Sequence, residues 1–201
     1  MHTGLVPDRV RRFTVSERAV HWLTALASLI LVLSGLLVGR SGAFHNVMYA
    51  MHLAAAVLLL CGALLIVATD DQRAVRRTAR ELGRLRDEDR AWLDAIPARL
   101  LHAAPEPPVA RFNAGQKINF MLVCILLAVL YVSGIDTIIA GTHHNLIFAS
   151  HKLATIALSI LVAGHLYMAL VNRATRPALR GMLTGQVDRK WAREHYPRWE
   201  P

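Results

Sequence analysis

Four stretches of the chain are apolar over about 20 residues each, and polar or charged segments separate them. The stretches run roughly over residues 19–38, 47–68, 118–140 and 148–171. Because about 20 apolar residues in an α-helix cross the 30 Å hydrocarbon core of a bilayer, each stretch predicts a membrane-spanning helix. The pattern therefore predicts an all-α fold, an integral membrane four-helix bundle, as a single membrane domain over residues 1–201. No internal sequence repeat is apparent.

The connection over residues 69–117 is the only sizeable soluble segment that this pattern predicts. Within it, Arg73–Arg99 intersperses Arg with acidic residues and Leu, which predicts a surface helix with solvated charges. The segment Pro105–Pro108 ends that helix before the third span. We interpret the helix as structural, with docking of a partner as the alternative.

Composition narrows the class of protein. Hydrophobic residues make up 54% of the chain and charged residues 18%, against about 25% charged in average globular chains. This balance excludes a disordered chain and argues against an ordinary soluble enzyme. Cys61 and Cys124 lie inside apolar stretches, so we expect small buried hydrophobes rather than a disulfide or a metal site.

The net charge of +9 raises the question of a nucleic-acid partner, and the distribution of the charges argues against one. Outside the spans, Lys and Arg number 21 in three segments, which are the N-terminal segment, residues 69–117 and the tail 172–201. The opposite side of the membrane has only Arg40 and Lys152. Because cytoplasmic segments carry the excess of Lys and Arg, both termini and the central connection are predicted to be cytoplasmic.

Four of the ten histidines lie inside the predicted spans, where ionisable side chains are costly and indicate function. His151 and His165 are 14 residues apart, so they share one helix face about 21 Å apart along the axis. The predicted topology places His21 at the cytoplasmic depth of His165. It places His52 at the outer depth of His151.

Each depth therefore holds two histidines from two helices. Two ligands are what a six-coordinate haem iron needs beyond its four porphyrin nitrogens, so the pattern favours two bis-histidine b-type haems. Zinc takes three or four protein ligands and is less favoured. The only acidic candidates are Glu17 at the inner depth and Asp136 at the outer depth, one for each pair of histidines. Hydrogen bonding between helices is the simpler alternative for such histidines.

Gly35 follows His21 by 14 residues and therefore lies near the same helix face at the outer depth. A residue without a side chain there would leave room for a porphyrin plane. Gly134 and Gly164 are candidates for the same role. Close helix–helix packing is the alternative for each of these glycines.

Five segments of the chain resemble those of a known family. They are Arg18–Trp22 at the first span, Phe112–Lys117 before the third span, Ser150–Leu153 and Gly164–Ala169 in the fourth span, and Lys190–Trp199 in the tail. The chain resembles the cytochrome b (gamma) subunit of respiratory membrane-bound formate dehydrogenase. The combination of the Asn113–Lys117 box, the 14-residue histidine spacing and the Pro-Arg-Trp tail makes the resemblance specific.

The resemblance implies specific ligands for each cofactor. The inner, cytoplasm-side haem b is held by His21 and His165, and the outer haem b by His52 and His151. A quinone site beside the inner haem is formed by Asn113, Gly115 and Gln116. Without the family, Asn113 is expected to be a helix N-cap and Lys117 a snorkelling anchor. For the outer haem, His143 or His144 is an alternative ligand to His52.

The resemblance also implies a function for the chain. It would be the electron-transfer and quinone-reducing subunit of an oxidoreductase complex in the prokaryotic inner membrane. Formate would be oxidised on a molybdenum or tungsten (alpha) subunit outside the membrane, and an iron–sulfur (beta) subunit would deliver electrons to the outer haem. Two alternatives remain, a cytochrome b subunit of the hydrogenase or thiosulfate reductase type, and a haem-free anchor or transporter.

Overall fold

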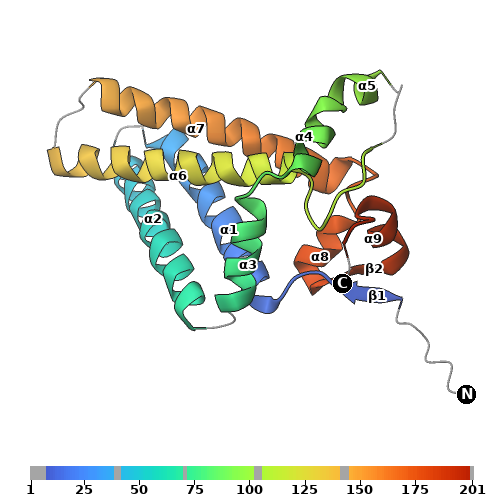
Figure 1. Ribbon diagram of the computed structural model, residues 1–201. Helices are drawn as coiled ribbons and strands as arrows, with labels where there is room; N and C mark the ends of the chain where they lie inside the picture. The colour runs from blue at the N-terminus through green and yellow to red at the C-terminus, as the bar shows by residue number, and fades with distance from the viewer. Residues whose placement is uncertain (1–7, 39–41, 70–71, 102–105, 141–144, 200–201) are drawn as a thin grey trace, which may run out of the picture. The chain divides into compact units, whose positions relative to one another are not determined.

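The computed structural model describes residues 8–38, 42–69, 72–101, 106–140 and 145–199, and these are mostly helical (Figure 1). The long helices are α1 (Val15–Leu37), α2 (Ala43–Thr69), α6 (Ala114–Ala140) and α7 (Asn145–Leu166). A π-helical turn, η1 (Tyr167–Val171), continues α7. All four helices are long and apolar enough to cross a membrane. The predicted all-α membrane fold is therefore confirmed.

Large apolar side chains are exposed along these helices, as a lipid environment requires. Leu36 is 70% exposed, Val132 71% and Ile139 79%. Cys61 and Cys124 are free thiols that are also exposed, so the expectation that they would be buried is wrong. Both lie within membrane-spanning helices, where an exposed position faces lipid and suits a small apolar side chain.

The chain divides into two compact units. We name residues 15–75 and 123–164 the helical unit. We name the described residues among 8–14, 76–122 and 165–199 the arginine unit.

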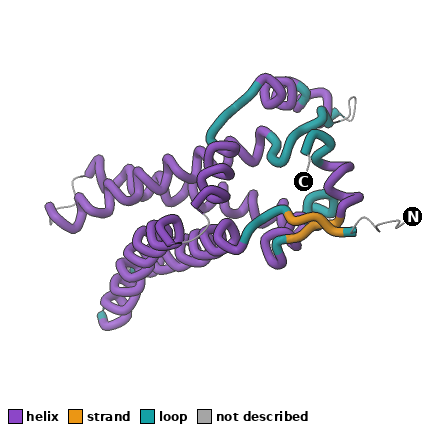
Figure 2. The backbone as a smooth tube through the Cα atoms, turned by 60° about the horizontal axis from the view of Figure 1, so that its bottom comes forward, coloured by secondary structure: helices purple, strands orange, loops and turns teal. Residues whose placement is uncertain are grey.

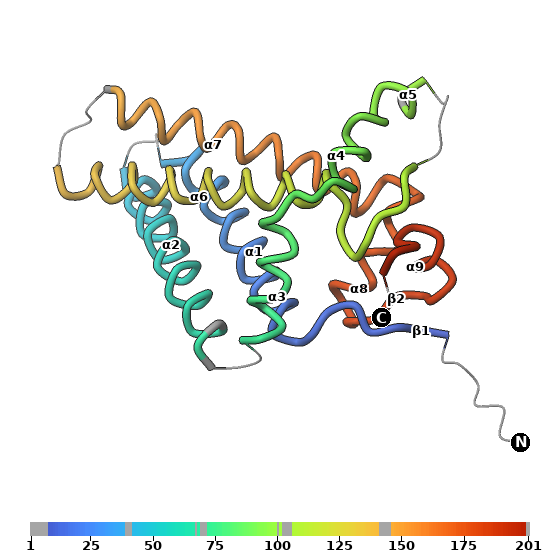
Figure 3. Tube along the Cα trace, viewed as in Figure 1, coloured from blue at the N-terminus to red at the C-terminus, as the bar shows by residue number. Residues whose placement is uncertain are grey.

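In the helical unit, α1 and α2 pack side by side (Figures 1 and 3). Their approach is close, because a Cβ atom at Gly62 would lie only 2.8 Å from Cδ2 of Leu23. Tyr131 on α6 donates a hydrogen bond of 2.7 Å to the backbone carbonyl of Ala56 on α2. Small residues such as Ala27 and Ala154 are buried, which is typical of packing between membrane helices.

In the arginine unit, strands β1 (Arg9–Arg11) and β2 (Gln186–Asp188) form an antiparallel ribbon with Val10 opposite Val187 (Figure 2). Helices α8 (Ala178–Thr184) and α9 (Arg189–His195) flank β2 along the chain. The buried side chains of Val10, Val187 and Ala192 form a small core against Trp191 and Trp199. The ribbon was not among the predicted elements.

The connection between α2 and α6 folds as three short helices, which are α3 (Gln72–Leu82), α4 (Asp87–Asp94) and α5 (Ile96–Leu100). The prediction of one surface helix over Arg73–Arg99 is therefore wrong. Helix α3 ends at Leu82, before Gly83, and α4 starts where the Asp89 carboxylate accepts a 2.7 Å hydrogen bond from the Arg86 backbone N–H. Pro105 lies outside the described residues, and residues 106–110 are not helical.

Candidate functional site

The helical unit brings together two of the predicted site histidines, His52 on α2 and His151 on α7. Their ring centroids are 6.3 Å apart and their planes are inclined by 55°. Both side chains are half-buried. Pairing of these two rings is what the predicted outer site requires.

Each of these histidines contacts a Ser-Gly pair on the preceding long helix. Ser34 Oγ lies 3.0 Å from Nδ1 of His52, and Ser133 Oγ lies 2.9 Å from Nδ1 of His151. A Cβ atom at Gly35 would lie 3.3 Å from Cε1 of His52. Glycine at position 35 therefore leaves room for the imidazole ring of His52, whereas the sequence suggested room for a porphyrin plane.

At Gly134 a Cβ atom would lie 3.5 Å from Cε1 of His151, which is ordinary van der Waals contact, so this position does not require glycine. At Gly164, a Cβ atom would meet nothing within 4 Å among the described residues. Of the three candidate glycines, Gly35 is therefore the one at which an added Cβ atom would crowd a histidine ring.

If a haem is bound here, His52 and His151 would hold its iron. The two rings come from two helices and their centroids are 6.3 Å apart, and imidazole nitrogen is a common ligand of haem iron. Among the described residues no group of three or more His, Cys, Asp or Glu side chains is gathered for a metal ion.

The Ser–His contacts also show that the chain contains an internal repeat, contrary to the sequence-based expectation. In both pairs the serine precedes the histidine by 18 residues. The second pair lies 99 residues after the first, and Arg111 likewise lies 99 residues after Arg12. At this offset the segments 12–59 and 111–158 align without a gap. Identical residues include Arg12/Arg111, Phe13/Phe112, Ser34/Ser133, Gly35/Gly134, Asn46/Asn145 and His52/His151.

The two predicted inner ligands, His21 and His165, lie in different compact units, so their pairing stays a prediction. The His21 ring makes an edge-on contact with Trp22, with centroids 5.5 Å apart. His165 lies in the last turn of α7, directly before the π-helical turn η1. Such turns often occur at functional sites.

The predicted quinone residues form the start of α6 in the arginine unit. Asn113 Oδ1 accepts a hydrogen bond from the Gln116 backbone N–H, and Gln116 Oε1 accepts one from the Asn113 N–H, both at 3.0 Å. This reciprocal capping box confirms Asn113 as an N-cap. Gln116 Nε2 donates to the Tyr196 hydroxyl at 3.5 Å. A Cβ atom at Gly115 would lie 3.2 Å from the Trp92 ring.

Lys117 is not the snorkelling anchor that the sequence indicates. It is 4% exposed, and its Nζ atom lies 2.6 Å from the carboxylate of Asp89, which is 1% exposed. The pair joins the first turn of α6 to α4 inside the arginine unit. The charges of Asp89 and Lys117 are therefore buried, so the prediction that the charges over Arg73–Arg99 are solvated is wrong at Asp89.

Sequence reasoning also missed a pair of buried arginines. Arg12 Nη2 donates to the Arg111 carbonyl at 2.8 Å, and Arg111 Nη2 donates to the Arg12 carbonyl. The Arg12 guanidinium lies 3.9 Å from the centre of the Tyr196 ring. Burial lowers the pKa of Arg12 from its ordinary value, while Tyr196 opposes that shift. The repeated Arg-Phe dipeptide, 99 residues apart, was the signal that could have revealed this pair.

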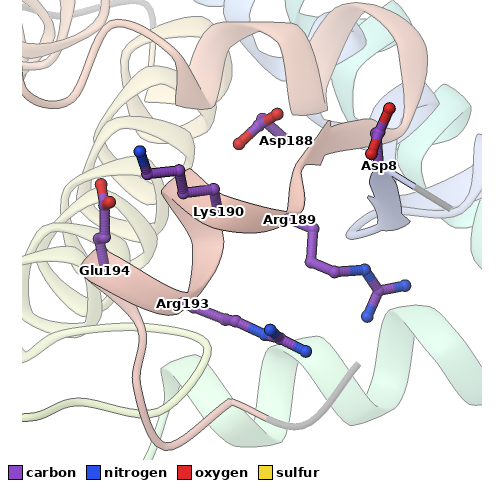
Figure 4. Close-up of a pocket in the computed structure, with 6 residues that line it drawn as sticks. All are labelled: Asp8, Asp188, Arg189, Lys190, Arg193 and Glu194. Atoms are coloured by element: carbon purple, nitrogen blue, oxygen red, sulfur yellow. The ribbon is translucent and has the colours of Figure 1, made fainter. Parts of the chain in front are cut away.

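Two cavities of the arginine unit are lined mainly by charged side chains. One, of about 370 Å³, is lined by Asp8 and by residues of β2 and α9 (Figure 4). The other, of about 350 Å³, is lined by Arg12, Arg111, Lys117 and others. Neither is lined by the described quinone candidates Asn113, Gly115 and Gln116. These two cavities therefore add no support for the predicted quinone site.

The remaining candidates are less informative. Glu17 is 8% exposed in α1, and Asp136 is half-buried in α6. His143 and His144, the alternative outer ligands, lie outside the described residues.

Four apolar helices with paired intramembrane histidines define the class of membrane-bound b-type cytochromes. A family model described as prokaryotic cytochrome b561 matches residues 12–185, and the chain belongs to this family. The family is one of haem b proteins of the prokaryotic inner membrane. This chain is accordingly a multi-pass protein of that membrane.

Individual relatives agree with this assignment. Over 203 residues the chain is 28% identical to the formate dehydrogenase cytochrome b556(fdo) subunit of Escherichia coli (strain K12), covering 96% of this chain and 92% of that protein. Over 100 residues it is 33% identical to the nitrate-inducible formate dehydrogenase cytochrome b556(Fdn) subunit of the same organism, covering 45% and 44%. The resemblance to formate dehydrogenase cytochrome b subunits is confirmed.

Proposed function

We propose that this chain carries electrons through two haem b groups from a formate dehydrogenase module on the outer face of the membrane to quinone near the cytoplasmic side. The single observation that carries the proposal is the His52–His151 pair, whose ring centroids are 6.3 Å apart inside the helical unit. Two imidazoles at that separation suit the axial positions of one iron.

His52 and His151 would hold the outer haem, and His21 and His165 the inner one. When bound, each haem iron accepts and releases one electron at a time. The contribution of the protein is to fix the imidazoles and to surround them with apolar helices. Buried small residues such as Ala27 and Ala154 support close contact between these helices.

The proposed orientation of the chain in the membrane would let this electron path build a membrane potential. The excess of Lys and Arg in the two terminal segments and the central connection supports a cytoplasmic location for all three. Electrons moving inward, with protons taken up from the cytoplasm, build a membrane potential that stores about 2.3 kcal/mol per charge per 100 mV.

Quinone would be reduced at the start of α6. The capping box uses the amide oxygens of Asn113 and Gln116, so the Asn113 NH₂ group is a donor that a quinone carbonyl could meet. The Gln116 NH₂ group also donates to the Tyr196 hydroxyl, which leaves its second hydrogen for quinone. Gly115 lies between the two amide residues in the chain, beside the ring of Trp92. Protons would come from the aqueous phase on that side.

The upstream partners are inferred from the relatives, whose names describe cytochrome subunits of formate dehydrogenase. We infer that an iron–sulfur subunit delivers electrons to the outer haem and that a molybdenum or tungsten subunit oxidises formate. The chain itself would not oxidise formate.

The test is a reduced-minus-oxidised spectrum of the purified complex, taken before and after formate is added. The proposal requires a b-type α-band that formate reduces, with two haems per chain. His165→Ala should remove the inner haem and stop quinone reduction, while formate still reduces the outer haem. A colourless chain, or two haems that survive His165→Ala, would contradict the proposal.

A further inference from the structure

The outer histidine pair is held in the same way on both sides. Ser34 on α1 contacts His52 on α2, and Ser133 on α6 contacts His151 on α7, each through Nδ1 of the ring. Both serines are almost fully buried, at 2% and 3% exposure. The two contacts are copies of one arrangement, in the repeated segments 12–59 and 111–158.

The hydrogen-bond geometry determines which atom donates. Ser34 Oγ lies 2.6 Å from the Ile30 carbonyl, and Ser133 Oγ lies 2.6 Å from the Val129 carbonyl. A hydroxyl has one proton and a carbonyl can only accept, so each serine proton is directed to its own helix. The contact to histidine then requires the ring Nδ1–H to donate to the serine oxygen.

This bond fixes the tautomer of each neutral ring. With the proton on Nδ1, the lone pair is on Nε2, which is the nitrogen left to bind a metal. Metal-binding histidines commonly donate their other N–H to an oxygen acceptor, which orients the ring and raises the basicity of the ligand. A Cβ atom at the adjacent Gly35 would lie 3.3 Å from Cε1 of His52, so glycine there leaves room for this ring.

We propose that Ser34 and Ser133 are equivalent positioning residues that fix Nε2 of His52 and His151 as the axial ligands of the outer haem and lower its midpoint potential. The proposal rests on the proposed function, because it assumes a haem between these rings. The more basic ligand stabilises ferric over ferrous iron, which lowers the potential.

The inner site has no such symmetry. At the offset of 99, the positions equivalent to His21 and His165 are Phe120 and Ile66. The serine effect should therefore be confined to the outer haem, and the inner haem serves as an internal reference.

The test is a redox titration of both haems in the intact complex carrying Ser34→Ala, Ser133→Ala or both. Each single variant should raise the midpoint potential of the outer haem by a similar amount. A tenfold change in the ferric–ferrous equilibrium corresponds to about 59 mV for one electron. The double variant should shift it further, and the inner haem should not move.

Ser159→Ala is the matched control, because Ser159 Oγ donates to the Thr155 carbonyl at 2.8 Å within α7. It should leave both potentials unchanged. Loss of the outer haem in the serine variants, with the inner haem kept and Ser159→Ala intact, also supports the proposal. Unchanged outer potential and haem content in both variants would overturn it. A wild-type complex without a second haem would instead contradict the proposed function.

Discussion

The buried ion pair between Lys117 and Asp89 offers a quantitative test of how α6 is anchored beside the predicted quinone site. Lys117→Met removes the positive charge, and the unbranched side chain keeps a similar length. The carboxylate of Asp89, 1% exposed, would then retain only the Arg86 backbone N–H as a hydrogen-bond donor among the described contacts. Removing one partner of a buried pair costs about 3–5 kcal/mol.

Thermal unfolding of the purified chain in detergent measures this effect. For a chain of this size, that cost corresponds to a fall in Tm of roughly 10 °C. The double variant Lys117→Met/Asp89→Asn should recover most of the loss, because the asparagine oxygen still accepts from Arg86 without a buried charge. Arg77→Met is the control, since Arg77 is 64% exposed and pairs with Glu81 at 3.7 Å. The control should cost about 0.5 kcal/mol or less.

The reasoning is refuted if Lys117→Met unfolds at the wild-type temperature. It is also refuted if the double variant is as unstable as the single one, because the loss would then not come from an unpaired carboxylate.

Three other predictions concern the two candidate sites and the topology. Gly35→Val should displace the His52 ring and lower the haem content, since even a Cβ atom would lie 3.3 Å from Cε1. Gly164→Ala is the control and should retain both haems. Equal haem content in the two variants would contradict this prediction. Asn113→Asp should keep the N-cap, and therefore the Tm, while quinone reductase activity falls because the NH₂ donor is lost. Asn113→Ala should lower quinone reductase activity and also the Tm, because losing the N-cap costs about 1 kcal/mol of stability. Full activity in Asn113→Asp would argue against a quinone contact. Reporter fusions at either end should report a cytoplasmic location. An outer location of both ends would reverse the proposed direction of electron flow, and an outer location of one end would contradict four spans.

The four membrane-spanning helices could be predicted from the sequence, because the apolar length that a span needs decides their place in the chain. A span needs about 20 apolar residues, and that demand is visible in the chain without any knowledge of packing. The helices nevertheless begin earlier than the apolar stretches, because their first turns contain polar residues such as Asn145 and Gln116. Hydropathy alone does not reveal where those first turns begin.

The soluble parts could not be predicted in the same way. Lys117 and Asp89 are 28 residues apart, and nothing in their local sequence indicates that they meet. The ribbon of β1 and β2 pairs three residues near the start of the chain with three near its end. Short elements of this kind depend on tertiary contacts, which a local pattern does not contain.

For the candidate site, spacing and topology predicted that His52 and His151 share one depth, and their rings are 6.3 Å apart. The serines were missed because Ser34 and Ser133 appear unremarkable within apolar helices, where a hydroxyl can bond its own backbone. Only the constant offset of 99 residues links them, and the identities that show it are sparse.

Haem content and redox spectra of His52→Ala and His151→Ala show whether these two histidines share one haem. If these two rings hold one haem between them, each variant should contain one haem per chain in place of two. The same haem should be missing from both, with the inner haem unchanged. Two haems in either variant, or loss of a different haem in each, would contradict the account.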